Sequence, residues 1–201
     1  ADSKNVLSSQ GLPLGPLEPL PVPKEDDLII IPGPRLRSQS KPPWVSETIL
    51  NWLRQASSAG AHLASVCTGA VALGEAGLLA GRRCTTHWEM IEAMQTRYPE
   101  ALVQNAVLYT HDGNITTSAG IASGIDTALS LVEQTYGPQL AAQVARYLVV
   151  YLRRDGTQSQ TSVYLEYRTH LHPGVHRVQD YLGQNPSNKI YLNRLAKLAD
   201  M

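Results

Sequence analysis

The chain has 201 residues, 43% hydrophobic and 17% charged, which is enough for one domain with a buried core and a short appendage. The formal net charge is zero, but residues 139–201 carry eight Lys and Arg against four Asp and Glu. That basic excess is a mild indication of contact with nucleic acid, although an ordinary solvated surface also explains it. No apolar stretch reaches the roughly 18 residues of a membrane span, no signal peptide is recognisable, and two cysteines make a poor disulfide framework. We therefore expect a cytoplasmic protein without membrane contact.

Strands and helices are expected to alternate along the first half of the chain. The first 24 residues are rich in proline and glycine, which predicts irregular or short extended structure. A β-branched run at 27–31, closed by Pro32-Gly33-Pro34, predicts a buried strand, and an apolar stripe predicts a helix over 43–57. A second apolar strand at 62–66 follows.

The next elements continue this alternation, which predicts a parallel sheet with helices on both faces. They are a helix that ends at Gly77, a strand over 82–86 and a helix over 88–98. Residues 103–109 and 114–117 predict a small antiparallel excursion, and helices over 124–136 and 139–152 close the domain.

Cys67 lies where the strand at 62–66 runs into a turn of small residues, the usual arrangement of a nucleophile elbow. A helix that begins near Thr68 is expected to direct its positive dipole end at the sulfur and to lower the pKa of the thiol. His87 follows the next strand and is expected at the same edge of the sheet. The alternative is that Cys67 is a small buried residue and His87 an ordinary helix-start residue.

Several separate blocks between residues 5 and 157 carry a family resemblance. They are Ala64-Ser-Val-Cys-Thr-Gly-Ala70, the run 73–83, Thr85-Thr-His-Trp88, Thr117-Ser-Ala-Gly120 and Gly124-Ile-Asp126. These blocks resemble the ThiJ/PfpI branch of the class I glutamine amidotransferase-like superfamily, in the form fused to AraC-type transcriptional regulators. The resemblance implies a three-layer α/β sandwich over residues 1–156, with a mostly parallel, flavodoxin-like sheet, followed by a C-terminal helical segment.

The resemblance also implies a site and a function. It suggests a non-catalytic domain that senses a small amino-acid-like or betaine-like metabolite, without a cofactor or a metal. The expected ligand-binding residues are Gly33, Cys67, Thr68, His87, Trp88 and Ser118. The alternative is a cysteine-dependent hydrolase or hydratase in which Cys67 is the nucleophile and His87 its acid–base partner.

Two departures from the family pattern favour ligand binding over catalysis. The strand–helix–strand with which the family begins, and the acidic residue near its first strand that usually partners the cysteine, have no counterpart in these residues. Pro34 stands where the family usually has a second glycine, and proline has no N–H to help stabilise an oxyanion. A pocket without a complete catalytic set still binds a small molecule.

The C-terminal residues resemble the beginning of an AraC-type helix-turn-helix domain. Residues 157–174 are expected to form a linker, and residues 175–201 two helices whose exposed Arg194 and Lys197 contact DNA. The module is expected to be incomplete, because the helix that enters the major groove has not begun at Met201. A homodimer is expected, with the helix at 139–152 and the linker passing ligand occupancy to the DNA-binding part. A plain helical hairpin packed on the main domain is the alternative.

Overall fold

The computed structural model describes residues 6–8, 10–35, 43–161, 168 and 170–201. The chain separates into two compact units, Ala1–Gln160 and Thr161–Met201, and each is described by itself. Among the described residues, no helix is long and apolar enough to cross a membrane.

A four-stranded sheet forms the centre of the first unit. Its order is β3 (Leu28–Ile31), β4 (His62–Val66), β8 (Ile115–Ser118) and β7 (Tyr109–Asp112). The first three strands are parallel, and β7 runs antiparallel to β8. The parallel strands bring their carboxyl ends, and the loops that follow them, to one edge of the sheet.

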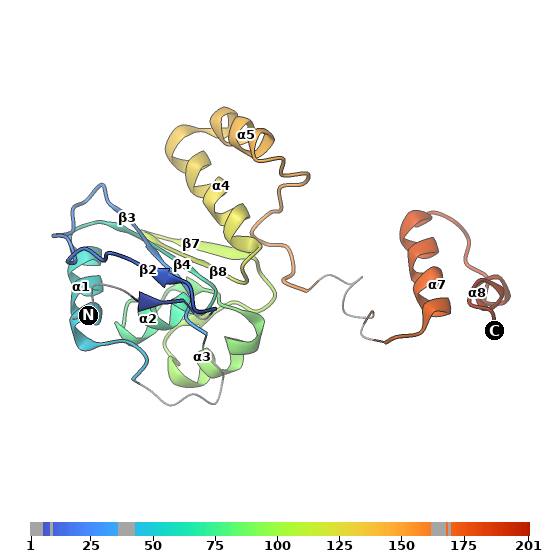
Figure 1. Ribbon diagram of the computed structural model, residues 1–201, viewed down its shortest axis with the longest axis horizontal. Coiled ribbons are helices and arrows are strands. Elements are labelled where there is room, and N and C mark those ends of the chain that lie inside the picture. Colours follow the sequence, from blue (N-terminus) through green and yellow to red (C-terminus); the bar gives the residue numbers. More distant parts are fainter. Residues whose placement is uncertain (1–5, 9, 36–42, 162–167, 169) are drawn as a thin grey trace. The chain divides into compact units, whose positions relative to one another are not determined.

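Helices cover both faces of this sheet, as the flavodoxin-like interpretation predicts (Figure 1). Three helices lie on one face: α1 (Glu47–Ser58), α2 (Ala70–Glu75) and α3 (Ile91–Arg97). On the other face lies α4 (Ser123–Tyr136), against which α5 (Pro138–Tyr147) packs. The predicted three-layer α/β sandwich is confirmed.

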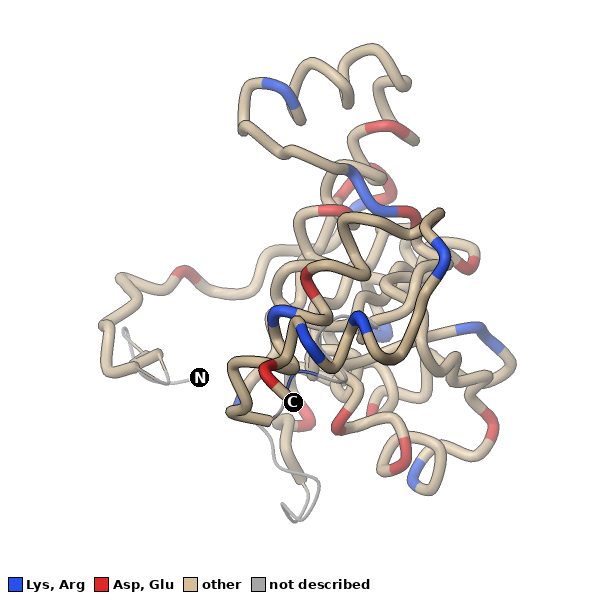
Figure 2. The backbone as a smooth tube through the Cα atoms, turned by 90° about the vertical axis from the view of Figure 1, so that its right-hand side faces the viewer, with Lys and Arg blue, Asp and Glu red and all other residues tan. Residues whose placement is uncertain are grey.

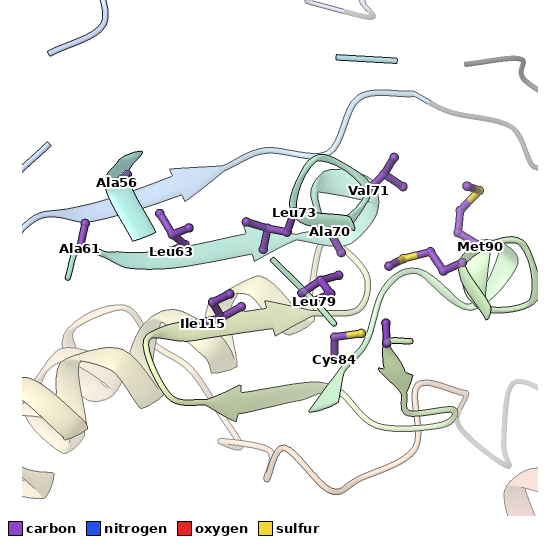
Figure 3. Close-up of a cluster of buried hydrophobic side chains, with 12 residues drawn as sticks. Ala56, Ala61, Leu63, Ala70, Val71, Leu73, Leu79, Cys84, Met90 and Ile115 are labelled. Atoms are coloured by element: carbon purple, nitrogen blue, oxygen red, sulfur yellow. The ribbon is translucent and has the colours of Figure 1, made fainter. Parts of the chain in front are cut away.

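The hydrophobic core lies between the sheet and the first helical face (Figure 3). Leu63 and Ile115 are neighbours in register on β4 and β8, and both are almost completely buried. The same cluster contains Leu73 from α2, Met94 from α3, and Leu79 from the segment between these two helices. Each large apolar side chain buried in this way contributes roughly 1.5–3 kcal/mol, which holds the sheet edge in place beneath the loops.

The predicted antiparallel excursion is confirmed in part, because β7 and β8 pair antiparallel on either side of Gly113, but its first strand and its place in the sheet differ from the prediction. The strand expected at 114–117 is β8, which lies in the middle of the sheet and pairs parallel with β4. The run expected at 103–109 is divided: Leu102–Val103 (β6) pairs parallel with Arg83–Cys84 (β5), and only Tyr109 enters β7. In the central sheet, β7 and β8 form an antiparallel hairpin, because Gly113, at φ 60°, allows a tight turn there. Apolar alternation identifies a strand but not its partner.

Backbone conformation determines where the helices end more than the apolar pattern of the sequence does. Gly77, at φ 76°, ends α2 with bonds from its own N–H to the Gly74 oxygen and from the Leu78 N–H to the Leu73 oxygen. The helix expected over 139–152 stops at Tyr147, because Val149 takes the same left-handed conformation at φ 56°. That conformation turns the remaining apolar residues out of the helix.

Other boundaries differ by a few residues. The N-terminal segment contains a short hairpin of Val6–Leu7 (β1) and Pro13–Leu14 (β2). The helix predicted from residue 43 begins at Glu47, and the one predicted from residue 88 begins with the 3-10 turn Trp88–Met90 (η2).

The second unit contains α7 (Pro173–Gln184) and α8 (Leu192–Leu198). A Cβ on Gly174 would lie 2.2 Å from the Ala199 carbonyl oxygen, so the two helices approach where no side chain fits. Leu192 is 80% exposed, because it is the first residue of α8. Much of the predicted linker, residues 162–167 and 169, lies outside the described residues.

Candidate ligand site at the cysteine elbow

Cys67 follows β4 directly and has a left-handed backbone, at φ 57°. A single 3-10 turn, Cys67–Gly69 (η1), separates β4 from α2. The α-helix therefore begins at Ala70 rather than near Thr68 as expected. A non-glycine residue at positive φ stores backbone strain, which is characteristic of functional turns, and the sharp turn places the cysteine at the sheet edge.

The turn after β3 packs tightly on this elbow. A Cβ on Gly33 would lie 2.7 Å from the Thr68 hydroxyl and 2.9 Å from the Thr68 nitrogen, so only glycine fits. The Thr68 hydroxyl donates a hydrogen bond to the Pro34 carbonyl. Pro34 lacks an N–H but supplies this acceptor. The structure thus brings Gly33, Cys67 and Thr68 together, as predicted from the sequence.

The segment that carries His87 contacts the elbow through the preceding residue, Thr86. The Thr86 hydroxyl donates to the Cys67 carbonyl at 2.9 Å. A Cβ on Gly120 would lie 3.7 Å from the His87 ring. Ser118 pairs in register with Val66, the residue before the cysteine. The loops after β4, β5 and β8 therefore meet at one place.

One buried hydroxyl at this edge is not satisfied. Ser118 is completely buried, and its Oγ has no hydrogen-bond partner among the described residues. A buried polar atom left in this way costs free energy, and a ligand that offers a hydrogen bond recovers it.

The thiol of Cys67 is held in its neutral form. Burial raises the pKa of Cys67, hydrogen bonds from the Thr68 N–H and hydroxyl oppose that effect in part, and the nearby Glu89 carboxylate raises it further. The predicted lowering of this pKa was wrong, because one 3-10 turn and a six-residue helix contribute less than burial does.

His87 contacts Glu89 through its Nδ1 atom. Its Nδ1 accepts from the Glu89 N–H at 3.4 Å and lies 3.8 Å from the Glu89 carboxylate. In the described part of the chain, no hydrogen bond joins His87 to Cys67. The His87 and Trp88 rings lie 5.5 Å apart, and Trp88 is 60% exposed. Glu89 was missed from the sequence, although a carboxylate two residues after a candidate base is a usable signal.

A separate apolar cavity of about 470 Å³ adjoins the elbow at Thr68 and Pro34. Its other walls come from β3, α1 and their flanking residues, including Trp44 and Trp52. The hydroxyls and the imidazole that would recognise a polar ligand lie at the elbow. No group of three or more metal-ligating side chains occurs within the ranges that the structure describes.

The predicted DNA contacts lie in the second unit. Arg194 and Lys197 are exposed on α8, and the Arg194 guanidinium lies 5.1 Å from the centre of the Tyr181 ring on α7. Figure 2 shows where the Lys and Arg residues lie along the backbone, with Asp and Glu residues among them.

Comparison with known proteins places this arrangement in a family. The model of the DJ-1/PfpI family matches residues 4–134, a span that contains the elbow, the His87 segment and Ser118. The chain belongs to the DJ-1/PfpI family. The resemblance seen in the sequence blocks is confirmed.

The chain resembles transcriptional regulators and an enzyme. It is 42% identical to the HTH-type transcriptional regulator CdhR of Pseudomonas aeruginosa over 75% of the chain and 43% of that protein. It is 37% identical to an isonitrile hydratase of Pseudomonas putida over 69% of the chain and 58% of that enzyme. The crystal structure of an AraC family regulator from Pseudomonas putida matches with a TM-score of 0.62 and 29% identity, over 73% of this chain and 77% of that one. The chain spans about half the length of these curated relatives.

Proposed function

We propose that this chain is the sensing part of an AraC-type transcriptional regulator, in which the first unit binds a small metabolite and controls DNA binding. The environment of Cys67 carries the proposal. The thiol is held neutral, no hydrogen bond reaches it from His87 in the described residues, and the nearest charged partner is a carboxylate that opposes thiolate formation. A site of this kind is suited to binding a ligand and not to nucleophilic catalysis by the cysteine. The 42% identity to a regulator supports the same conclusion.

The effector we propose is amino-acid-like or betaine-like. Ser118, Thr68 and His87 offer hydrogen bonds to a carboxylate or an amine, and the exposed face of Trp88 offers a surface for a cationic group. No cofactor is needed for this role.

Thermal-shift screening tests the proposal. Amino acids and betaines at millimolar concentration are expected to raise the melting temperature when one of them binds. The Ser118→Ala variant is expected to lose that shift, whereas Ser58→Ala, at the exposed end of α1, keeps it. Absence of any shift across both classes would contradict the proposed effector class.

The rival function is cysteine-dependent catalysis, which the 37% identity to an isonitrile hydratase favours. The two functions differ in the reactivity of Cys67. We expect alkylation by iodoacetamide to be slow at pH 6, because burial raises the pKa of Cys67. The rate is expected to increase only at a pH above the pKa of an ordinary thiol. Rapid labelling at pH 6, absent in Cys67→Ser, together with hydration of an isonitrile, would establish the enzyme instead.

We propose that Arg194 and Lys197 contact DNA phosphates. Replacing either by alanine is expected to weaken binding to a generic duplex and to reduce the salt dependence of binding by about one unit of slope. Lys24→Ala removes an exposed lysine from the first unit and serves as the control. Equal affinity in all variants would contradict the assignment.

We also propose a homodimer, because regulators of this type read repeated half-sites. The end of α5 and the residues after it offer apolar surface that a second copy would cover, since Tyr147, Val149 and Tyr151 are each more than 80% exposed. Sedimentation of wild type and of Tyr151→Asp tests this. A monomer in both would contradict it.

A further inference from the structure

The chain returns from α5 to the sheet before it enters the second unit (Figure 1). We call residues 153–160 the strap. Arg153 pairs with Glu133, and Arg154 makes two bonds to the buried carboxylate of Asp126 at 2.6 and 2.9 Å. These two pairs fasten the first residues of the strap to α4.

The middle of the strap is fastened to the β7 side of the sheet. The Gly156 carbonyl accepts from the Leu108 N–H at 2.8 Å and from the Tyr109 N–H at 3.4 Å. A Cβ on Gly156 would lie 2.8 Å from the Tyr109 ring, so the backbone approaches as closely as glycine allows.

The end of the strap reaches the candidate ligand site. Gln160 donates from Nε2 to the Thr86 carbonyl at 3.0 Å and to the Thr85 hydroxyl at 3.2 Å. Thr86 in turn donates from its hydroxyl to the Cys67 carbonyl at 2.9 Å. Two consecutive hydrogen bonds through Thr86 therefore join the strained elbow to Gln160, the last residue of the first unit.

We propose that Gln160 is a positioning residue for the sensor site, which holds the Thr85–Thr86 segment against the Cys67 elbow and transmits changes at the elbow to the start of the second unit. The inference rests on the proposed function, because it assigns the route by which that site is regulated. It modifies the route expected through a helix over 139–152 and the linker, since α5 ends at Tyr147 and Gln160, at the end of the strap, is bonded to the Thr86 carbonyl.

The physical argument concerns what a ligand displaces. A group that binds beside Cys67 and shifts the elbow backbone also shifts the Cys67 carbonyl to which the Thr86 hydroxyl is bonded. Thr86 is completely buried, so its displacement also moves the carbonyl that Gln160 binds. Coupling of this kind is reciprocal: loss of the Gln160 bond must loosen the elbow as much as elbow rearrangement loosens Gln160.

The first experiment measures the effect of Gln160 on Cys67. Gln160→Met keeps the length of the side chain but removes its N–H donor, and Gln158→Met makes the same change at an exposed position two residues earlier on the strap. We expect Gln160→Met to accelerate alkylation of Cys67 by iodoacetamide about fivefold at pH 8, the size of one neutral hydrogen bond, and Gln158→Met to leave the rate unchanged.

Alkylation of Cys84 shows whether Gln160→Met has loosened the whole fold. It is free and completely buried, and burial raises its pKa to about 11. Global loosening labels both cysteines, whereas the proposed coupling accelerates only Cys67. Equal Cys67 rates in Gln160→Met and wild type, or parallel acceleration of Cys84, would overturn the proposal.

The second experiment runs in the opposite direction. Alkylation of Cys67 by iodoacetamide is expected to increase amide hydrogen exchange in the peptide that covers 153–160, in wild type but not in Thr86→Val, which lacks the hydroxyl that contacts the elbow. Unchanged exchange in alkylated wild type would overturn the coupling. Both experiments need neither effector nor DNA, so their outcome is separate from the effector screen that tests the proposed function.

Discussion

The α4 face of the sheet and the elbow at its carboxyl edge hold their polar side chains in different ways. On the α4 side, the Thr116 hydroxyl bonds to His62 Nε2 at 2.8 Å and to His111 Nδ1 at 2.7 Å, and His111 Nε2 bonds to the Ser130 hydroxyl at 2.8 Å. We call these four residues the α4 network. At the elbow, by contrast, side chains bond to backbone carbonyls, the cysteine backbone is strained, and the Ser118 hydroxyl has no partner among the described residues.

The difference separates stability from function. A polar group that is bonded to its neighbours holds the fold together, whereas one left without a partner is available to a ligand. No sequence motif pointed to the α4 network, yet it joins strands β4, β7 and β8 to α4. The motifs lie at the elbow, where strain and an unsatisfied hydroxyl reduce stability.

The largest effect is expected where α4 is fastened to the strap. Asp126 is 2% exposed and receives two bonds from the Arg154 side chain. Asp126→Asn leaves the arginine without its charge partner and is expected to lower the free energy of unfolding by about 3 kcal/mol, measured in urea. Glu133→Gln changes the neighbouring pair with Arg153, which is far less buried and is worth about 0–1 kcal/mol. Equal losses would show that burial does not distinguish the pairs.

Breaking the α4 network is expected to cost somewhat less. Thr116→Val is nearly isosteric but removes the hydroxyl that both histidines bind, leaving ring nitrogens unsatisfied at about 2 kcal/mol. Thr135→Val, which removes an exposed hydroxyl bonded within α4, is expected to change stability by less than about 0.5 kcal/mol. Chemical denaturation of both variants checks this, and a small effect of Thr116→Val would remove the distinction between the α4 face and the elbow.

The same network predicts a pH dependence. Burial lowers the pKa of both His62 and His111, and the charge of His62 lowers the pKa of His111 further, so the folded protein holds both rings neutral. Stability is therefore full above the unfolded value of about 6.5 and is lost as the pH falls through the lowered folded-state pKa.

Unfolding measured between pH 8 and 5 is expected to show this loss in wild type and in His87→Gln, but not in the double variant His62→Gln/His111→Gln. The Asp155 carboxylate does not interfere, because its hydrogen bonds with Thr157 hold its pKa below 3.8, under this window. A wild-type curve that stays flat to pH 5 would contradict the assignment.

The smallest effect concerns strain at the elbow. Cys67 and Val149 have almost the same left-handed φ, 57° and 56°. Glycine at either position is expected to raise the free energy of unfolding by about 1 kcal/mol, since it takes this conformation without a Cβ penalty. Only Cys67→Gly is expected to abolish effector binding. A destabilised Cys67→Gly would show that the cysteine side chain stabilises the fold more than its backbone strains it.

Much of the architecture was predictable because its signals are local. The β-branched run at 28–31, the strand that ends before Cys67, and Gly77 at the end of α2 each depend on a few consecutive residues. The position of β8 was not predictable in this way. Three of its four residues are Thr or Ser, which does not predict a buried strand, but all four are buried in the interior of the sheet.

The candidate site, like the fold, was predictable only in part. Sequence blocks identified Gly33, Cys67, Thr68 and Ser118, and the structure brings their segments together. The protonation state of Cys67 was predicted wrongly, because a helix dipole can be anticipated from a pattern whereas burial depends on the whole fold. Glu89 and Gln160 lay outside every motif.

The sequence by itself determined the family, the order of strands and helices, and the turn at which the cysteine stands, because each of these is written in neighbouring residues. Only the tertiary structure decided that the thiol is neutral, that His62 and His111 share one hydroxyl, and that Gln160 binds Thr86 across 74 positions of the chain. Those properties depend on which groups meet through space and on how much water folding removes around them.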